Sequence, residues 1–336
     1  MLSDPLIDQI LTALPGKRIC VLGDLFLDRY LDLDASLTEP SVETGLDAYQ
    51  VVRVRFYPGA LGTVINNLAA LGVGTIRPIA FYGDDGEGYE LQQALAQFPA
   101  VQTRRGLLVA PSRRTPTYTK PILIRTGEQP HELNRLDIKN RTPTSLAVEK
   151  ILIEYLDESW RDIDALIVVD QVSEQNCGVV TDRVRVRLAE LSAVDPSRFV
   201  LVDSRERIRE FRNVCVKPNQ REATAFPGGP AAFAKSLGRH VFQTLGEEGI
   251  DLYAPAGTRT QIPAYPVTGP TDIVGAGDST SAGIACAVMA GATFEQAAAF
   301  GNLVASITIQ QIGVTGTATP EQVRERWRQV QSGQTR

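Results

Sequence analysis

From residue 144 onward the chain alternates regularly between helix-forming and strand-forming segments, and this alternation limits the fold more than any other feature. Helices are predicted at Ser145–Trp160 and Asn176–Leu191, and short apolar strands at Ala165–Asp170, Phe199–Asp203 and Val214–Lys217. Strands joined by helices form right-handed crossovers and a mostly parallel sheet that is covered on both faces. The sequence therefore predicts an α/β fold. Because no linker or internal repeat interrupts it, we expect residues 1–336 to form a single domain.

Carboxylates follow several of the predicted strands. Asp24 and Asp28 come just after the apolar strand Arg18–Gly23, and Asp170 and Asp203 close two later strands. Ligands of open α/β sheets bind at the carboxyl ends of the strands, and ionised carboxylates suit the hydroxyls of a polyol. Turn formation and helix or strand capping explain Asp24 and Asp28 equally well, so both interpretations stay open.

Two further segments predict a small sheet that stands apart from the main one. Polar turns at residues 36–45 precede the alternating segment Val51–Tyr57, and Thr115–Arg125 is followed by His131–Asp137. Such alternation is typical of strands with one solvated face. We therefore expect a β lid formed by segments of approximately 30–57 and 112–137. A small exposed sheet has edges and an apolar face to cover, which leaves open a homodimer formed through the lid.

Thr271–Gly283 contains a glycine-rich turn that runs into a series of small apolar residues. Gly275 and Gly277 allow backbone N–H groups to approach a ligand, and the positive end of the helix that follows favours an anion. Asp278 at this position has two interpretations. It is either a helix N-cap, which the turn alone favours, or a base directed at a hydroxyl that attacks a phosphoryl group.

Composition and missing motifs exclude several classes of protein. A net charge of −5 without a dominant basic cluster argues against a nucleic-acid-binding surface, and no apolar run reaches membrane-spanning length. The four cysteines lack metal-type spacing and fit buried thiols in a reducing cytoplasm, while two histidines offer little to a metal site. The sequence has no P-loop, and Thr280 stands where a dinucleotide-binding fingerprint would have its third glycine.

Five short motifs, spread in order over most of the chain, together resemble the ribokinase-like (PfkB-type) carbohydrate kinases. They are Gly23-Asp-x3-Asp28, Pro58-Gly59, Asn219-x2-Glu222, Thr244-Leu-Gly-x2-Gly249 and Asp272-x2-Gly-Ala-Gly-Asp278. The strings around Asp28 and at Asn134–Asp137 are most similar to the branch of heptose-7-phosphate kinases. The resemblance implies a ribokinase-like fold and ATP-dependent, Mg²⁺-dependent transfer of a phosphoryl group to a hydroxyl of a sugar or sugar phosphate, with a heptose 7-phosphate favoured.

The resemblance also implies a role for each motif. Asp278 would be the base, with its basicity lowered by the helix start, and the N–H groups of Gly275, Ala276 and Gly277 would form the anion hole. Asn219 and Glu222 would hold Mg²⁺ through water, although an ordinary helix start is the structural alternative. The implied nucleotide site adds Thr244, Gly246, Gly249 and Asn302. The implied acceptor site comprises Asp24, Asp28, Gly59, Thr63 and Asn67.

Three positions depart from the pattern of that family. Ala60 replaces a glycine, Thr63 replaces an asparagine and Val274 replaces a threonine. These changes leave the acceptor open among heptose 7-phosphate, fructose, ribose and a nucleoside, and they motivate a second hypothesis, a non-catalytic sugar- or nucleotide-binding protein. A monovalent-cation site near Asp272 also stays open. A phosphorylated acceptor would need cationic side chains, for which the candidates are Arg29, Arg53, Arg55, Arg125, Arg135 and, just past a strand, Arg205; the alternative for most of them is a solvated strand face.

Overall fold

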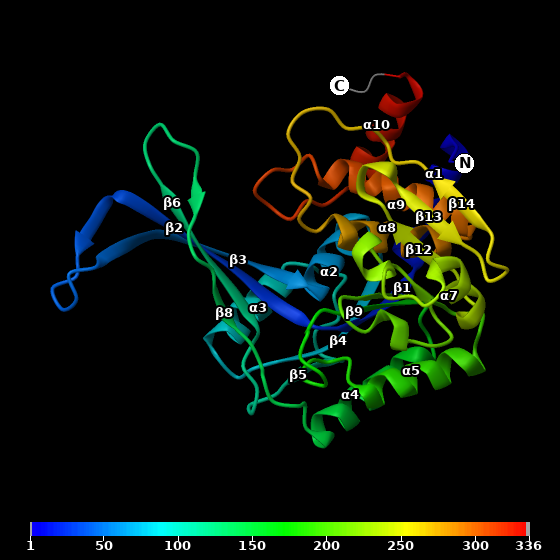
Figure 1. Cartoon of the computed structure of the whole chain (residues 1–336), viewed down its shortest axis with the longest axis horizontal. Helices are drawn as coiled ribbons and strands as arrows, with labels where there is room; N and C mark the ends of the chain where they lie inside the picture. The colour runs from blue at the N-terminus through cyan, green and yellow to red at the C-terminus, as the bar shows by residue number, and fades with distance from the viewer. Residues whose placement is uncertain (1, 334–336) are drawn as a thin grey trace.

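The computed structural model describes residues 2–333, and its centre is a nine-stranded sheet (Figure 1). In spatial order the strands are β14 (Arg259–Ile262), β13 (Ile250–Tyr253), β12 (Val241–Thr244), β11 (Cys215–Val216), β10 (Phe199–Ser204), β9 (Ala165–Asp170), β1 (Arg18–Gly23), β4 (Thr75–Tyr82) and β5 (Leu107–Val109). The strands from β12 to β5 pair in parallel, and β13 and β14 add an antiparallel hairpin at one edge. Every residue of β9 and β10 is buried, as expected for strands covered on both faces.

Helices lie on both faces of this sheet, with α4 and α5 on one side and α8 and α9 on the other (Figure 1). Their bounds are α1 (Asp4–Ala13), α2 (Leu61–Ala70), α3 (Gly86–Leu95), α4 (Leu146–Trp160), α5 (Asp182–Val194), α6 (Gln220–Ala223), α7 (Gly229–Leu237), α8 (Ala276–Met289), α9 (Phe294–Thr308) and α10 (Pro320–Gln331). Helices α8 and α9 approach closely at Gly283, where a Cβ would lie 2.9 Å from the Cα of Gly301. The small residues that begin at Gly275 therefore form a fixed, buried helix behind the turn.

A second sheet forms the lid and extends away from the body of the molecule (Figure 1). It contains β2 (Leu25–Pro40), β3 (Asp47–Ala60), β6 (Thr117–Ile124), β7 (His131–Glu132) and β8 (Leu136–Ile138). β2 pairs antiparallel with β3 and parallel with β6, and β6 pairs antiparallel with β7 and β8. The predicted α/β fold, with a mostly parallel sheet, helices on both faces and a small β lid, is confirmed.

Two local predictions were wrong. The polar residues around Ser36 were expected in turns but continue β2, which begins at Leu25, two residues after the end of β1, and contains Asp28. Helix α5 begins at Asp182 and not at Asn176, because Thr181 caps it by accepting a hydrogen bond from the N–H of Val184 and because Asn176 has a φ of 59°. In the part of the chain that the structure describes, no helix has the length and apolar character needed to cross a membrane.

Candidate active site

Two oppositely charged side chains meet at the carboxyl edge of the central sheet. Asp203 is the last but one residue of β10, Lys217 follows β11, and the Lys217 ammonium lies 2.7 Å from the Asp203 carboxylate. Both side chains are buried. A Cβ built on Gly277 would lie 3.4 Å from the Lys217 nitrogen, so this cation lies directly beside the glycine-rich turn. The central sheet therefore places a buried cation next to the turn at which the sequence predicted that an anion binds.

Asp278 lies in the first turn of α8, next to this pair. Burial raises the pKa of Asp278 to about 7, and the negative charge of Asp203 adds to the increase, while Lys217 and Arg205 oppose it. The predicted lowering of its basicity by the helix start was therefore wrong, because burial and a neighbouring carboxylate outweigh the helix dipole. A carboxylate with a pKa near 7 is well matched to accept a proton at neutral pH.

The N-cap residue of α8 is Gly275 and not Asp278. Gly275 is the N-cap of α8 with a φ of 79°, and Asp278 is the third residue of the helix. The N-cap interpretation of Asp278 was therefore wrong. Within residues 2–333, the N–H groups of Gly275, Gly277 and Asp278 have no hydrogen-bond acceptor, whereas the Ala276 N–H donates to the Ile273 carbonyl. Three donors are thus available to an anion, and Asp278 supplies one of them in place of Ala276.

The lid brings a second carboxylate to the site. Asp28 on β2 forms an ion pair with Lys120 on β6, with 3.2 Å between the carboxylate oxygen and the ammonium nitrogen. A Cβ on Gly59 would collide with the Asp28 carboxylate, so any larger residue at this position would have to displace that carboxylate. Thr63, at the start of α2, lies against the turn of α8, because a Cβ on Gly275 would lie 3.2 Å from the Thr63 methyl group. Asp28, Gly59 and Thr63 thus come together with Gly275.

Asp24 and Asn67 are almost fully buried. Both oxygens of the Asp24 carboxylate accept backbone hydrogen bonds, from Gln171 (2.8 Å), Val172 (2.9 Å) and Val179 (2.8 Å). Burial and the nearby Asp170 raise the pKa of Asp24 to about 6. Asn67 is fully buried and donates to the Thr63 carbonyl at 2.9 Å. Their geometry is that of residues that hold the loop after β9 and the start of α2, which for Asp24 corresponds to the capping interpretation.

Asn219 and Glu222 form a capping box at the start of α6. The Asn219 N–H donates to Glu222 Oε2 at 2.8 Å, and the Glu222 N–H donates to Asn219 Oδ1 at 2.9 Å. Their oxygen donors are of the type that Mg²⁺ prefers. Within residues 2–333 no group of three or more His, Cys, Asp or Glu side chains could hold a metal ion. These residues therefore fit Mg²⁺ only as one part of a coordination shell that water and phosphate would complete.

The residues predicted to bind a nucleotide lie around the hairpin edge of the sheet. Thr244 bridges to Asn219, and Gly246, with a φ of 61°, borders open space. A Cβ on Gly249 would collide with the Ile262 carbonyl. Asn302 on α9 donates to the carbonyls of Ile262 and Pro263, both at 3.1 Å. Gly249 and Asn302 thus both contact the start of the segment that leads from β14 to α8.

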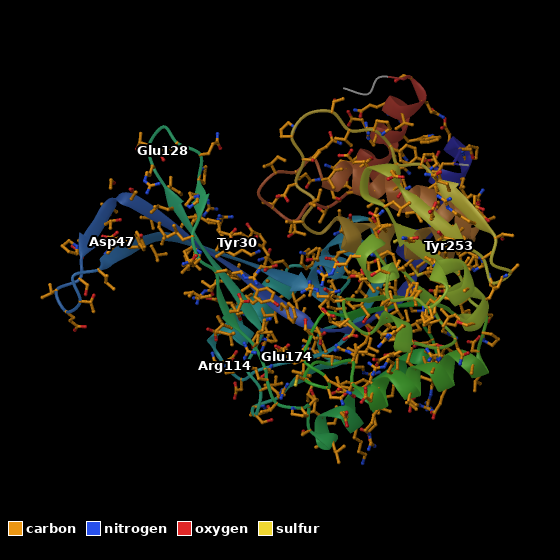
Figure 2. The ribbon with its side chains drawn as sticks, viewed as in Figure 1. Tyr30, Asp47, Arg114, Glu128, Glu174 and Tyr253 are labelled. Atoms are coloured by element: carbon orange, nitrogen blue, oxygen red, sulfur yellow. The ribbon has the colours of Figure 1, made fainter. Side chains whose placement is uncertain are left out.

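The sequence did not reveal Lys217, Lys120 or Tyr118 as site residues. Lys217 could have been found, because it directly follows the last apolar residue of a predicted strand. Lys120 and Tyr118 could not, because their position depends on the register Asp28↔Tyr118 and Tyr30↔Lys120 between strands far apart in the sequence. Figure 2 shows Tyr30 in the lid between the body and the outer ends marked by Asp47 and Glu128.

The arginines proposed for a phosphorylated acceptor separate into two groups. Three are paired with carboxylates of the lid or of α3: Arg29 with Glu90, Arg55 with Asp32 and Arg125 with Glu128. Arg135 is also paired, with Asp137 at 2.6 Å, and in addition it stacks on the Tyr118 ring, 4.3 Å from its centroid. Lys139 lies 6.0 Å from the same centroid. Burial raises the pKa of the Tyr118 hydroxyl, and the charges of Arg205 and Arg135 oppose that increase. Tyr118 therefore has three cations around it.

Comparison with protein families agrees with this geometry. Residues 17–322 match the model of the pfkB family carbohydrate kinases. The chain belongs to the pfkB family. Members of this family are enzymes that phosphorylate sugars, so the predicted recognition and enzyme class are confirmed. Among curated pfkB relatives, "Bifunctional protein HldE" of Trichlorobacter lovleyi is 30% identical over 325 residues, which cover 91% of this chain and 62% of that protein. The chain thus spans less than two thirds of that relative.

Solved structures of other pfkB-fold proteins support the fold. Phosphofructokinase-2 from Escherichia coli in complex with potassium superposes with a TM-score of 0.68 at 17% identity, covering 94% of this chain and 99% of that chain. Arabidopsis thaliana ribokinase complexed with ribose and ATP gives a TM-score of 0.64 at 15% identity, covering 92% and 98%. At these identities the likeness concerns the fold alone.

Proposed function

We propose that this protein transfers the γ-phosphoryl group of ATP to a hydroxyl of a sugar or sugar phosphate, with Asp278 as the base. The observation that carries the proposal is the position of Asp278. Burial raises its pKa to about 7, and it lies in a turn with three N–H groups that have no acceptor among residues 2–333, beside the buried Lys217 ammonium. A base and an anion-binding turn in one place are what phosphoryl transfer to a hydroxyl requires.

The proposed reaction runs through these residues as follows. Ionised Asp278 accepts the proton of the acceptor hydroxyl while the hydroxyl oxygen bonds to the γ-phosphorus and the bond between that phosphorus and the bridging oxygen of ADP breaks. The N–H groups of Gly275, Gly277 and Asp278 and the Lys217 ammonium bind the transferring phosphoryl oxygens. Asn219 and Glu222 would hold Mg²⁺ through water, and the ion would neutralise charge on the β- and γ-phosphates. Thr244, Gly246, Gly249 and Asn302 would line the nucleotide site.

The acceptor that we favour is a heptose 7-phosphate. The resemblance of the chain to that branch and its relatives named HldE support this choice. The cations around Tyr118 add a physical reason. Asp137 pairs with Arg135, but Lys139 and Arg205 bring further positive charge, which a dianionic phosphate needs more than a neutral sugar does. Asp28, fixed by Lys120 and facing Gly59, would accept hydrogen bonds from sugar hydroxyls. Fructose, ribose and a nucleoside are the alternatives.

ADP release measured with a panel of acceptors tests both the role of Asp278 as the base and the choice of a phosphorylated acceptor. The panel contains fructose and fructose 6-phosphate, ribose and ribose 5-phosphate, heptose 7-phosphate and a nucleoside, each with the wild type and Asp278→Asn. We expect release with at least one acceptor and its loss in Asp278→Asn. Equal activity of the two proteins would refute Asp278 as the base. A preference for the unphosphorylated member of each pair would refute the phosphorylated acceptor.

A non-catalytic binding protein is the second candidate. It is favoured by Ala60 and Thr63, which add or replace groups at the acceptor site, and by Val274, which is exposed at the glycine-rich turn. Calorimetry that detects tight binding of ATP or a sugar, without ADP release across the whole panel, would support it. The raised pKa of Asp278 speaks against it, because a binding protein gains nothing from a base at its anion site.

Three further properties belong to this proposal. We propose a cytoplasmic location, since all four cysteines are buried and unpaired.

Both oxygens of Asp272 accept hydrogen bonds from backbone N–H groups, those of Val274 and Gly313. A monovalent cation near Asp272 would therefore bind mainly to carbonyls. A homodimer through the lid would cover its exposed apolar side chains, which are Leu37, Val42, Leu46, Tyr49, Val51, Val52, Val54 and Tyr57.

A further inference from the structure

Residues 263–275 connect β14 to α8 without regular secondary structure. This segment begins next to the proposed nucleotide residues Gly249 and Asn302 and ends at the turn with the free N–H groups. At its far end, the Asp272 N–H donates to the Ile309 carbonyl at 2.8 Å. Between these ends, residues 268–271 are exposed. The position of the segment therefore depends on how firmly its ends are held.

Arg326 on α10 holds the first end. Its side chain is 4% exposed, and its Nε donates to Ser306 on α9 at 3.1 Å, while one terminal nitrogen donates to the Pro266 carbonyl. The other terminal nitrogen is 3.5 Å from Gln329 Oε1. Arg326 forms no ion pair with any residue between 2 and 333. It is a buried cation whose partners are all neutral.

Stability alone does not account for this arrangement. Burial lowers the pKa of Arg326, which reflects the unfavourable transfer of a charge out of water. A neutral side chain of similar volume would avoid that penalty, since replacing buried charges by apolar groups is often neutral or stabilising. The guanidinium can instead hold two parts of the chain in a fixed relative position, because its planar set of donors reaches both α9 and the segment at Pro266.

The geometry points to Arg326 as a positioning residue for ATP, an inference that rests on the proposed nucleotide site. Asn302 and Ser306 lie one turn apart on α9. Asn302 donates to the carbonyls of residues 262 and 263. Arg326 links Ser306 to the carbonyl of Pro266, a few residues further along the same segment. Gly249 approaches the same segment at Ile262. Residues 262–266 are thereby fixed as one wall of the nucleotide pocket, and Arg326 acts on ATP only through them.

Three variants test this role. Arg326→Met keeps the volume and removes the donors, Arg326→Lys keeps a cation with one donor group, and Arg324→Met is the control on the same helix, because Arg324 pairs with Asp8 at the surface. We expect Arg326→Met to raise the Kd for ATP, measured by calorimetry, and the KM for ATP at least fivefold, with the acceptor KM unchanged. Arg326→Lys should restore part of the loss, and Arg324→Met should behave as the wild type.

A folded Arg326→Met protein that binds ATP like the wild type would overturn the inference, as would an equal rise in the KM values for ATP and acceptor. If Arg326→Met does not fold, Ser306→Ala removes one partner of the guanidinium and keeps the cation. Unchanged ATP binding in both Ser306→Ala and Arg326→Lys then overturns it as well. Calorimetry needs no turnover, so a wild type that binds ATP without transferring phosphate would refute the proposed function and leave this test intact.

Discussion

Replacing Ala60 by glycine is expected to stabilise the protein. Ala60 joins the lid strand β3 to helix α2 with a φ of 51° and a ψ of −111°, a conformation that side chains with a Cβ rarely adopt. Such backbone strain costs about 1–3 kcal/mol. Glycine removes it but increases the entropy of the unfolded chain, which costs about 0.4–1 kcal/mol. The net gain in the free energy of unfolding is therefore about 1 kcal/mol.

Urea denaturation followed by circular dichroism measures this gain. Gly59→Ala is the matched neighbour, because its new methyl group would collide with the Asp28 carboxylate and should destabilise the protein by about 1–3 kcal/mol. A loss of about 1 kcal/mol in Ala60→Gly, the usual cost of glycine in regular structure, would refute the strained conformation of Ala60. If the Ala60 methyl group also restricts the acceptor, Ala60→Gly should lower the acceptor KM.

The remaining predictions concern the charges of the site and the lid. The rate of ADP release should fall as the pH drops through about 7, because Asp278 must be ionised to act as a base. Asp203→Asn should lower the midpoint of the pH profile of kcat/KM by about one pH unit, because it removes a neighbouring negative charge. The pKa of Asp278 is raised in the folded protein, so ionisation of this carboxyl opposes folding. Asp278→Asn should therefore have a higher Tm than the wild type, by a margin that grows as the pH rises from about 4 and levels off above about 7. A margin that does not change with pH would contradict this. Lys120→Met should raise the acceptor KM about tenfold and leave the KM for ATP unchanged, since it frees the Asp28 carboxylate from its partner. If the lid forms a dimer, Val54→Glu should yield monomers in light scattering, and an unchanged mass would argue against that interface.

Much of the fold could be predicted because its signals are local. Strand β1 was expected at Arg18–Gly23, where the structure has it, since a short apolar run ending in glycine is sufficient for a buried strand. The start of α5 was misplaced because Asn176, like the actual cap Thr181, is a residue type that commonly begins a helix. The polar residues around Ser36 were expected in turns, because their strand conformation depends on cross-strand pairing that no single segment reveals.

The site was predictable in outline and not in its electrostatics. Motif spacing identified Asp278 and the glycines around it, but the pKa of Asp278 depends on Asp203, which arrives from a different strand. The buried Lys217 next to Gly277 and the pairing of Asp28 with Lys120 likewise arise only when distant elements meet. Asp24 shows the reverse case, in which a strand-end carboxylate is fully used by backbone N–H groups.

The division of the site between lid and body bears on how the protein would protect ATP. Asp28 and Lys120 belong to lid strands, whereas Asp278 and Lys217 belong to the body. Any opening of the lid would separate Asp28, proposed to hold the acceptor, from Asp278, proposed to be the base. A water molecule entering an open site would meet Asp278 without the carboxylate that orients a hydroxyl. With the proposed roles, opening of the lid would suppress futile hydrolysis by taking the site apart, and ATP would be consumed only when an acceptor keeps both halves together.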